Sequence, residues 1–437
     1  MEGLGSPAPW AGGSVPGPSP RWSGVAPPGG RPPGFVLPAF VLSSSSRSSL
    51  PVLDFTPSPT HLEVAEVARA AARDVLAPNA ARWDREGGFP SDNLAQLAER
   101  GLLAIGVGRS LGGRGAGTVA YSLAVTELAR ACAATTVALC VSNMVAEVVE
   151  AFGNADQRGH WVPKLAAGAL EVGAFALSEA GAGSDPGGMR TRARKTAKGW
   201  VIDGSKLWIT SGSDAGLFVV WARTNDSPGP RGLSCFLVPG DTPGLTRGKP
   251  EHKMGLNGST TTAIEFDGCE VSDDALLGGE GTGFRVAMMA LDGGRIGIAS
   301  QALGIALQAT DLAIAHATKT TRFGRPLATL QGVQWPLADN ATQLDAARLL
   351  TLRAAWLKEN GKPFSREASI AKVYATEASF AACNRAIEAM GAAGYDAAAE
   401  VERHFRDVRV TMIYEGTSEV QRIVISREIM RRFSEGG

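Results

Sequence analysis

The spacing of apolar residues changes twice along this chain of 437 residues. From Thr60 to about residue 170, apolar side chains recur every three or four residues, which is typical of amphipathic helices. Residues 171–282 instead hold short apolar runs of strand length, separated by Gly, Asp and Pro, and the helical period returns from Gly283 to Arg432. This order predicts a helical region, then an antiparallel β-barrel or sandwich, then a second helical region.

Individual elements follow from the same pattern. The first helical run begins at Thr60 and should be broken by Pro78, and a second helix should run from Ser91, as its cap, to Arg100. Two further helices are expected at Tyr121–Phe152 and Gln157–Ala167. The predicted strands are Gly173–Ser178, Met189–Ala197, Trp200–Ile202, Lys206–Thr210, Leu217–Thr224, Leu233–Pro239 and Thr262–Phe266.

Residues 1–59 differ from the rest of the chain. They contain 13 Pro, 9 Gly and 11 Ser but only five charged side chains, so they cannot bury enough apolar surface to fold. This composition favours a disordered extension or a misplaced start codon over a mitochondrial transit peptide, which needs an amphipathic helix. The predicted domains are therefore 1–59 (extension), 60–170 (helical), 171–282 (barrel) and 283–437 (helical bundle).

Charge and composition exclude several classes of function. Lys plus Arg and Asp plus Glu are each 43, so the chain offers no net charge for nucleic acid or an anionic membrane. The five cysteines form no CxxC and the five histidines no HExxH, which argues against a disulfide framework or a metal site. No run of 18 apolar residues indicates a transmembrane segment. We expect a soluble, cytoplasmic bacterial protein, because Arg outnumbers Lys 33 to 10, or a mitochondrial matrix protein if the extension is a transit peptide.

Two Gly-containing segments of the middle region could bind a ligand. The run from Phe175 to Asp185, FALSEAGAGSD, is a strand leading into a turn whose free backbone N–H groups could cradle a phosphate, or it is a plain tight turn. In KLWITSG, Trp208 and Thr210 share one face of a strand, so a flat ring could stack there while Thr210 bonds its edge, or both pack the barrel. GxGxxG-like matches lack the strand–turn–helix context of a dinucleotide fold, and no P-loop occurs.

A third segment, IYEGTSEVQ, places a carboxylate just before a helix. Ser418 and Gln421 have capping-box spacing, so Glu415 should lie in the turn that precedes the helix N-terminus. Gly416 leaves room for a ligand to approach. Taken alone, Glu415 could equally be a solvated turn residue.

Together, ALSEAGAGSD, KLWITSG, LDGGRIGIASQALGIA, RFGRPLATLQ and IYEGTSEVQR resemble the acyl-CoA dehydrogenase family, especially its short-chain, butyryl-CoA branch. The resemblance covers about residues 60–433. It implies an α+β multidomain fold with an N-terminal helical domain, a central antiparallel β-barrel and a C-terminal four-helix bundle. It also implies a homotetramer with FAD between barrel and bundle, and an electron-transfer flavoprotein as electron acceptor.

The resemblance also assigns roles to residues. Glu415 is implied as the base that removes the α-proton of an acyl-CoA while the β-hydride passes to flavin N5. Gly294 stands where other branches carry their base, which supports Glu415 as the base here. The implied FAD contacts are Phe175, Leu177, Ser178, Trp208, Ile209, Thr210, Arg322, Gln331, Glu388, Gly391, Thr417, Ser418 and Glu419. The implied substrate contacts are Ser184, Asp292, Arg295 and Gly416.

Two departures from the family pattern concern the FAD pyrophosphate. Thr320 stands where the family has Arg, with Arg322 two residues on, and Glu388 replaces a Gln. Losing a cation and gaining an anion both disfavour a bound pyrophosphate, so a weakened grip on FAD is predicted. The alternatives to a dehydrogenase are a flavin monooxygenase or acyl-CoA oxidase on the same fold, or a structural paralogue with an impaired cofactor site.

Overall fold

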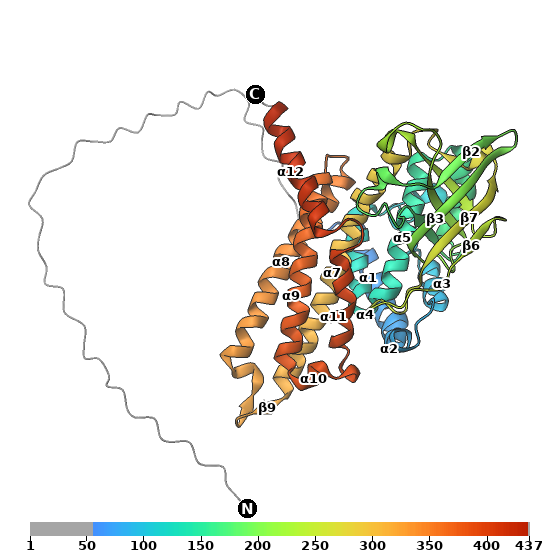
Figure 1. Cartoon of the computed structure of the whole chain (residues 1–437). Coiled ribbons are helices and arrows are strands. Elements are labelled where there is room, and N and C mark those ends of the chain that lie inside the picture. The colour runs from blue at the N-terminus through green and yellow to red at the C-terminus, as the bar shows by residue number, and fades with distance from the viewer. Residues whose placement is uncertain (1–55, 436–437) are drawn as a thin grey trace, which may run out of the picture. The chain divides into compact units, whose positions relative to one another are not determined.

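The computed structural model describes residues 56–435, and its ribbon is shown in Figure 1. The predicted extension, apart from residues 56–59, lies outside these described residues. The N-terminal region is helical, as predicted. Its helices are α1 (Pro59–Ala71), a π-helical segment (Ala72–Leu76), α2 (Ala77–Glu86), α3 (Ser91–Glu99), α4 (Gly117–Ala131), α5 (Ala133–Phe152) and α6 (Ala155–Ala166).

Three local predictions for this region were wrong. Pro78 does not end the first helical run, because it falls in the first turn of α2, where a missing N–H leaves little unsatisfied. Ser91 is the first residue of α3 and caps nothing, since Pro90 occupies the cap position. The long helix expected at Tyr121–Phe152 is two helices, because Cys132 adopts an extended conformation (φ −151°, ψ 98°) between α4 and α5.

The middle region is a β-sheet of eight strands. Its pairing order is β6-β7-β3-β2-β4-β5-β8, with β1 added to β4. The bounds are β1 (Gly173–Ala176), β2 (Arg192–Thr196), β3 (Gly199–Thr210), β4 (Leu217–Arg223), β5 (Leu233–Pro239), β6 (Leu245–Arg247), β7 (Thr261–Val271) and β8 (Leu276–Leu277).

The sheet is mostly antiparallel, but β1 runs parallel to β4, and β2 pairs with β4 in parallel at one position. Among the described strands, no pairing joins β6 to β8, so closure into a barrel is not seen in the ladder. The two strands predicted at 200–202 and 206–210 are one strand, β3, whose register on β7 shifts between Ile202 and Gly204 and between Lys206 and Ile209. These irregularities bend a long strand and hide its continuity in the sequence.

The C-terminal region is again helical, with α7, α8, α9 and α11 packed together (Figure 1). Their bounds are α7 (Gly283–Lys319), α8 (Gln331–Glu359), α9 (Ser365–Met390), α10 (Ala392–Tyr395), α11 (Val401–Arg409) and α12 (Ser418–Glu435). A hairpin of β9 (Thr321–Arg322) and β10 (Arg325–Pro326) links α7 to α8. The order of helices, strands and helices predicted from the sequence is thus confirmed.

Two helices, α5 and α7, are long and apolar enough by length and composition to cross a membrane. In the structure, 78% of the most apolar window of α5 and 67% of that of α7 is buried inside the fold. Both helices contribute to the core, where α7 contacts α4 and α5 as well as α8 and α9. Their apolar character is explained by this burial, and α7 joins the two helical regions through its contacts with α4 and α5 on one side and α8 and α9 on the other.

Candidate active site

Glu415 lies in the short turn between the 3₁₀ turn Val410–Met412 and α12. Its φ is +54° and that of Gly416 is +88°, so two consecutive residues adopt the left-handed conformation. For Glu415, which carries a Cβ, this conformation is strained and must be held by the surroundings. One such restraint is the hydroxyl of Tyr414, which donates to Oε1 of Gln301 on α7 at 2.5 Å.

The Glu415 carboxylate points into the protein. Its Oε2 atom is buried and has no hydrogen-bond partner within the described part of the chain. A Cβ built on Gly294 of α7 would lie 2.6 Å from this oxygen and 3.3 Å from Sδ of Met144 on α5. The glycine therefore leaves the space that the carboxylate occupies, and Oε2 is free to accept a proton.

Burial raises the pKa of Glu415 to about 7, although the positive charges of Arg295 and Lys372 act in the opposite direction. Burial therefore outweighs the two opposing charges. A carboxyl group with this pKa is partly ionised at neutral pH and is much more basic than an exposed glutamate. It suits a general base.

The cap of α12 differs from the prediction. The hydroxyl of Thr417, not of Ser418, accepts the backbone N–H of Val420, at 3.3 Å. Ser418 is the first residue of α12, and its buried Oγ has no hydrogen-bond partner among residues 56–435. The predicted capping box on Ser418 and Gln421 was therefore wrong, and Ser418 keeps a hydroxyl available for a ligand.

The predicted flavin-contacting residues of the sheet lie on β1 and β3 and in the segment after β1. Trp208 is 62% exposed and has a φ of +60°, which is unusual for a large side chain in a strand. Thr210 is half-buried on the same strand, while Ile209 between them is buried. An exposed indole beside a hydroxyl leaves a flat, open surface, as an aromatic ligand requires.

Phe175, Leu177 and Ser178 form the wall next to this strand. The Phe175 ring packs against Trp221, with ring centroids 4.3 Å apart, and Leu177 is buried. The carbonyl of Ser178 accepts the N–H of Leu207 at 2.9 Å. This bond places the segment after β1 beside the strand that carries Trp208.

A buried ion pair, which was absent from the sequence-based predictions, also connects strand β3 to the segment after β1. Nζ of Lys206 lies 2.8 Å from Oε1 of Glu179 and donates to the carbonyl of Leu177 at 3.2 Å. Burial lowers the pKa of Lys206 to about 8, while Glu179 opposes this. Glu179 also accepts the backbone N–H groups of Arg190 and Thr191. The pair links strand β3 to the Gly-rich turn.

Of the predicted substrate contacts, Asp292 and Arg295 lie on one face of α7. Arg295 is buried, and its NH1 bonds Oδ1 of Asp292 at 2.5 Å and Oγ of Ser369 at 3.1 Å. Ser365 on α9 also donates to Asp292. Arg295 thus faces the interior near Glu415 rather than the surface, and its charge acts on the carboxylate.

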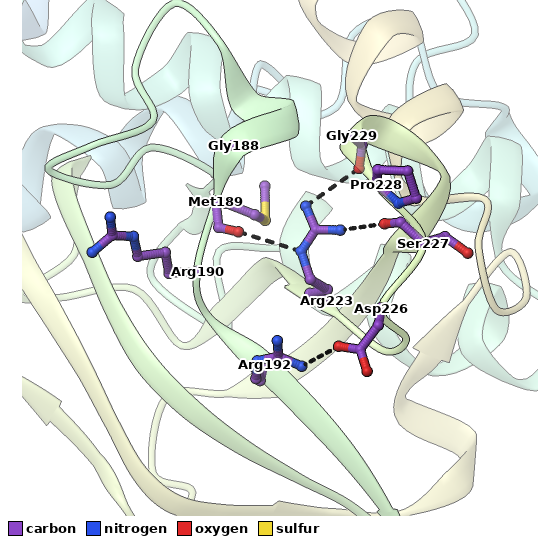
Figure 2. Close-up of a pocket in the computed structure, with 9 residues that line it drawn as sticks. All are labelled: Gly188, Met189, Arg190, Arg192, Arg223, Asp226, Ser227, Pro228 and Gly229. Carbon is purple, nitrogen blue, oxygen red and sulfur yellow. Dashed lines mark hydrogen bonds and ion pairs between the residues drawn. The ribbon is translucent and has the colours of Figure 1, made fainter.

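Ser184, the remaining predicted substrate contact apart from Gly416, is exposed in the turn after β1. A cavity of about 560 Å³ lies where this turn passes into β2, and Figure 2 shows its lining. Of its three arginines, Arg223 is bonded to backbone carbonyls including those of Ser227 and Gly187, and Arg192 pairs with Asp226 at 3.0 Å. The side chain of Arg190 is joined by no dashed line to the other eight residues drawn in Figure 2. Glu415 is not among the lining residues, so this cavity is not one that the Glu415 carboxylate faces.

The remaining predicted FAD contacts lie elsewhere on the same chain. Arg322 and Gln331 are exposed at the end of α7 and the start of α8, and Glu388 and Gly391 are exposed at the end of α9. Thr320 is the C-cap of α7, 25 residues beyond Arg295, which is about 37 Å along a helix. In Figure 1, β9 and α10 mark this end of the bundle, well away from the sheet. The structure thus separates the predicted FAD contacts into two groups.

Lys372 is a residue of this site that sequence reasoning missed. It is completely buried on α9, and its Nζ donates to the carbonyl of Gly416 at 2.8 Å. One signal was available, because Lys372 stands within the apolar stripe of Ala368, Ala371 and Ala375, where a lysine is out of place. Among residues 56–435, no three His, Cys, Asp or Glu side chains cluster as metal ligands.

Comparisons with known proteins agree with this geometry. The N-terminal, middle and C-terminal domain models of acyl-CoA dehydrogenases match residues 58–169, 174–269 and 281–430. The mitochondrial short-chain specific acyl-CoA dehydrogenase of Mus musculus is 45% identical over 86% of this chain and 91% of its own length.

Two solved structures share the fold. Butyryl-CoA dehydrogenase from Megasphaera elsdenii has a TM-score of 0.85 and 36% identity, covering 86% of this chain and all of that one. A chain in a structure of the electron transferring flavoprotein of Acidaminococcus fermentans has the same TM-score and identity, covering 87% of this chain and all of that one. The chain therefore belongs to the acyl-CoA dehydrogenase family of oxidoreductases.

Proposed function

We propose that this protein is an FAD-dependent dehydrogenase of short, straight-chain acyl-CoA thioesters, with Glu415 as the base and a trans-2-enoyl-CoA as the product. The observation that carries the proposal is the buried, unpartnered Oε2 of Glu415 beside Gly294. The relatives named as short-chain acyl-CoA dehydrogenase and butyryl-CoA dehydrogenase support the substrate class.

In the proposed reaction, Oε2 of Glu415 takes a proton from the α-carbon of the thioester, and a C=C bond forms to the β-carbon. A pKa of about 7 makes this carboxylate basic enough to compete for a weakly acidic proton and leaves much of it ionised at neutral pH. Enolate charge on the thioester oxygen needs hydrogen-bond donors, and the family resemblance assigns the backbone N–H of Glu415 to this role. The positive charges of Arg295 and Lys372 act on Glu415 and favour its ionised form.

Residues of strand β3 and of the start of α12 fit FAD. Trp208 offers an exposed aromatic surface, Thr210 lies two residues on, and Ser418 has a buried hydroxyl without a partner in the described chain. Bound FAD would supply the acceptor for the hydride that leaves the β-carbon. On this proposal Phe175, Leu177 and the Trp208–Thr210 strand shape one side of the flavin pocket, and Thr417–Glu419 the other.

A single chain does not bring all of the proposed FAD contacts together, because Arg322, Gln331, Glu388 and Gly391 lie at the far end of the bundle. We therefore propose a homotetramer in which a second copy supplies these residues. Exposed apolar side chains on α12 support such an association: Ile423, Met430 and Phe433 are 63%, 68% and 80% exposed and lie on one helix face.

We further propose the domain division 60–170, 171–282 and 283–437, with the substrate held by Ser184, Asp292, Arg295 and Gly416. An electron-transfer flavoprotein is the proposed electron acceptor, because a chain of similar fold occurs in a structure of such a protein.

The test is an activity assay on acyl-CoA substrates of increasing chain length, with purified wild-type protein and Glu415→Gln. The wild type should bleach its flavin absorbance with butyryl-CoA and show its best kcat/KM with short chains. Glu415→Gln should bind FAD equally and lose most turnover, because an amide cannot accept the α-proton. Wild-type turnover by Glu415→Gln would exclude Glu415 as the base. A best substrate longer than about ten carbons would exclude the proposed preference for short chains, because the depth of the pocket limits the chain length it can hold.

A further inference from the structure

Lys372 is a buried cation in an unusual setting. Its side chain has no exposed surface, and its Nζ donates to one backbone carbonyl, that of Gly416, at 2.8 Å. Within residues 56–435, Lys372 makes no salt bridge, and the carboxylates whose charges act on it do so without a hydrogen bond. Burying an ammonium group without a salt bridge is expensive, so the position calls for a compensating interaction.

Besides the bond from Tyr414 to Gln301 of α7, two further helices hold the turn that carries Glu415. From α12, the fully buried Gln421 donates through Nε2 to the carbonyls of Glu415 and Gly416, at 3.2 and 2.9 Å. From α9, Lys372 donates to the carbonyl of Gly416. The left-handed turn is therefore tied by two side chains, of which one is neutral and the other is positively charged.

Few charged groups act on Glu415. Arg295 on α7 and Lys372 on α9 are the cations that act on it. Tyr121 on α4, Cys140 on α5 and the neighbouring Tyr414 also face it, and all three stay neutral because burial raises their pKa values. Four charged groups in turn interact electrostatically with Lys372. They are Arg295 and the carboxylates of Glu415, Glu419 and Glu377, and Glu415 acts most strongly.

We propose that Lys372 is a positioning residue for the base: its ammonium group ties down the carbonyl of Gly416, and its charge holds Glu415 in the ionised form that accepts the proton. This inference rests on the proposed role of Glu415. The compensation for burying Lys372 is thus the carboxylate one residue before the carbonyl it binds. Burial raises the pKa of Glu415, and Lys372 together with Arg295 limits that rise to about 7.

Two substitutions separate the charge of Lys372 from its hydrogen bond. Lys372→Gln keeps a donor in reach of the Gly416 carbonyl but removes the charge. Gln421→Met removes the neutral donor to the same carbonyl but keeps the charge. The pH dependence of kcat/KM reports the ionisation of the free enzyme, so its acid limb measures the base.

For Lys372→Gln, we expect the acid limb to move up by roughly one pH unit, since that is the usual effect of removing a nearby opposite charge. Turnover on the alkaline plateau should persist. Gln421→Met should lower kcat by loosening the turn but keep the wild-type midpoint. An unchanged midpoint in Lys372→Gln, or an equal shift in both variants, would overturn the proposal.

Lys372→Arg covers the case in which Lys372→Gln does not fold. Because the cation is retained, its midpoint should equal that of the wild type, and a raised midpoint would contradict the proposal. The result for Glu415→Gln distinguishes the two levels of inference. If that variant is inactive while Lys372→Gln titrates like the wild type, only the role of Lys372 fails. If Glu415→Gln is active, the assigned base itself fails.

Discussion

Gly294 and Glu415, which are 121 positions apart in sequence, face each other so closely that a Cβ at position 294 would lie 2.6 Å from Oε2 of Glu415. The glycine is helical and needs no special φ, so its value lies in the space it leaves. The two residues therefore share one volume, which agrees with the sequence-based expectation that other branches of the family carry their base at the position of Gly294. Only one of them can carry the carboxylate.

The first prediction is that Gly294→Ala lowers kcat/KM by on the order of 10- to 100-fold, because the new methyl group displaces the carboxylate from its reactive position. Flavin absorbance of the purified variant should match that of the wild type, since neither β3 nor α12 is touched. Steady-state kinetics with butyryl-CoA would measure the loss. Gly293→Ala is the comparison at the neighbouring position, because its Cβ would lie 2.9 Å from Nζ of Lys358 instead of close to Glu415. Wild-type kinetics in Gly294→Ala would show that the carboxylate acts from another position.

The second prediction concerns a relocated base. Glu415→Gly should be almost inactive, and adding Gly294→Glu to it should restore part of the activity, because the new carboxylate enters the vacated space from α7. The restored kcat should stay below that of the wild type. Lys372 and Gln421 position a carboxylate at residue 415 by holding its turn, but they do not position one at residue 294 on helix α7. Comparing single-turnover bleaching of the flavin in the single and double variants checks this. If the double variant were no faster than Glu415→Gly, the shared-volume account would fail.

Much of the fold and the position of Glu415 in the chain could be predicted from the sequence, because both depend on local patterns. Changes of apolar period mark the three regions, and the IYEGTSEVQ segment places Glu415 in a turn before a helix. Errors of one position arose where adjacent residues offer the same chemistry. Thr417 and Ser418 both carry hydroxyls, and only the backbone geometry decides which of them caps α12.

Features that depend on distant neighbours could not be predicted. Cys132 separates the apolar helices α4 and α5, and no Gly or Pro marks this break in the sequence. Lys372 and Lys206 look like ordinary lysines until helix and sheet packing buries them against the Gly416 carbonyl and Glu179. The pKa of Glu415 likewise depends on burial by α5 and α7, which no local pattern of residues expresses.

The third prediction is a pH dependence of stability. Glu415 has a pKa of about 7 in the folded protein against 4.5 for an ordinary glutamate, so between pH 4.5 and 7 the folded state binds more protons than the unfolded state. Stability must then fall as pH rises through this window, by on the order of 2–3 kcal/mol for this group. Glu415→Gln lacks the titration, so its advantage over the wild type should grow from pH 5 to pH 8.

Denaturant unfolding of FAD-saturated protein at several pH values measures this difference. Glu265→Gln is the matched control, because Glu265 is an exposed carboxylate on β7 and should leave the pH trend of the wild type unchanged. A constant difference between wild type and Glu415→Gln at all pH values would mean that the carboxyl group is not perturbed.

The fourth prediction concerns the buried ion pair between Lys206 of β3 and Glu179. Lys206→Met should destabilise the protein by about 3–5 kcal/mol, because it leaves the buried Glu179 carboxylate unpaired. The carbonyl of Leu177 also loses its donor, so the Gly-rich turn should loosen and FAD should dissociate faster. Adding Glu179→Gln should recover part of the stability, because it removes the unpaired charge and its amide oxygen can still accept one of the two N–H groups, those of Arg190 and Thr191, that the carboxylate accepts. Urea unfolding of both variants tests this. A cost below about 1 kcal/mol for Lys206→Met, which is the range of exposed pairs, would contradict the burial of the pair.

The fifth prediction concerns FAD affinity at the far end of the bundle. Thr320 ends α7 with its Oγ1 3.3 Å from Nε2 of His316, and the exposed Glu388 accepts a hydrogen bond from Asn384. Neither side chain offers a positive charge to a pyrophosphate. Thr320→Arg combined with Glu388→Gln should therefore raise FAD retention, each restored charge-assisted contact contributing on the order of 1–3 kcal/mol before discounting for exposure.

The competing account assigns the pyrophosphate to Arg322. This arginine is exposed on β9, and its NH1 donates to the carbonyl of Thr321 at 2.9 Å, so its guanidinium remains accessible to a ligand from a second copy. On that account Arg322→Ala alone would strip the flavin, and the double substitution would change little. Titrating apo-protein with FAD for the wild type and for both variants distinguishes the two, with Arg325→Ala on the neighbouring strand as the control for nonspecific loss of charge. If all four proteins bound FAD with one affinity, neither group of residues would touch the pyrophosphate, and the second-copy arrangement proposed for FAD would lose its support.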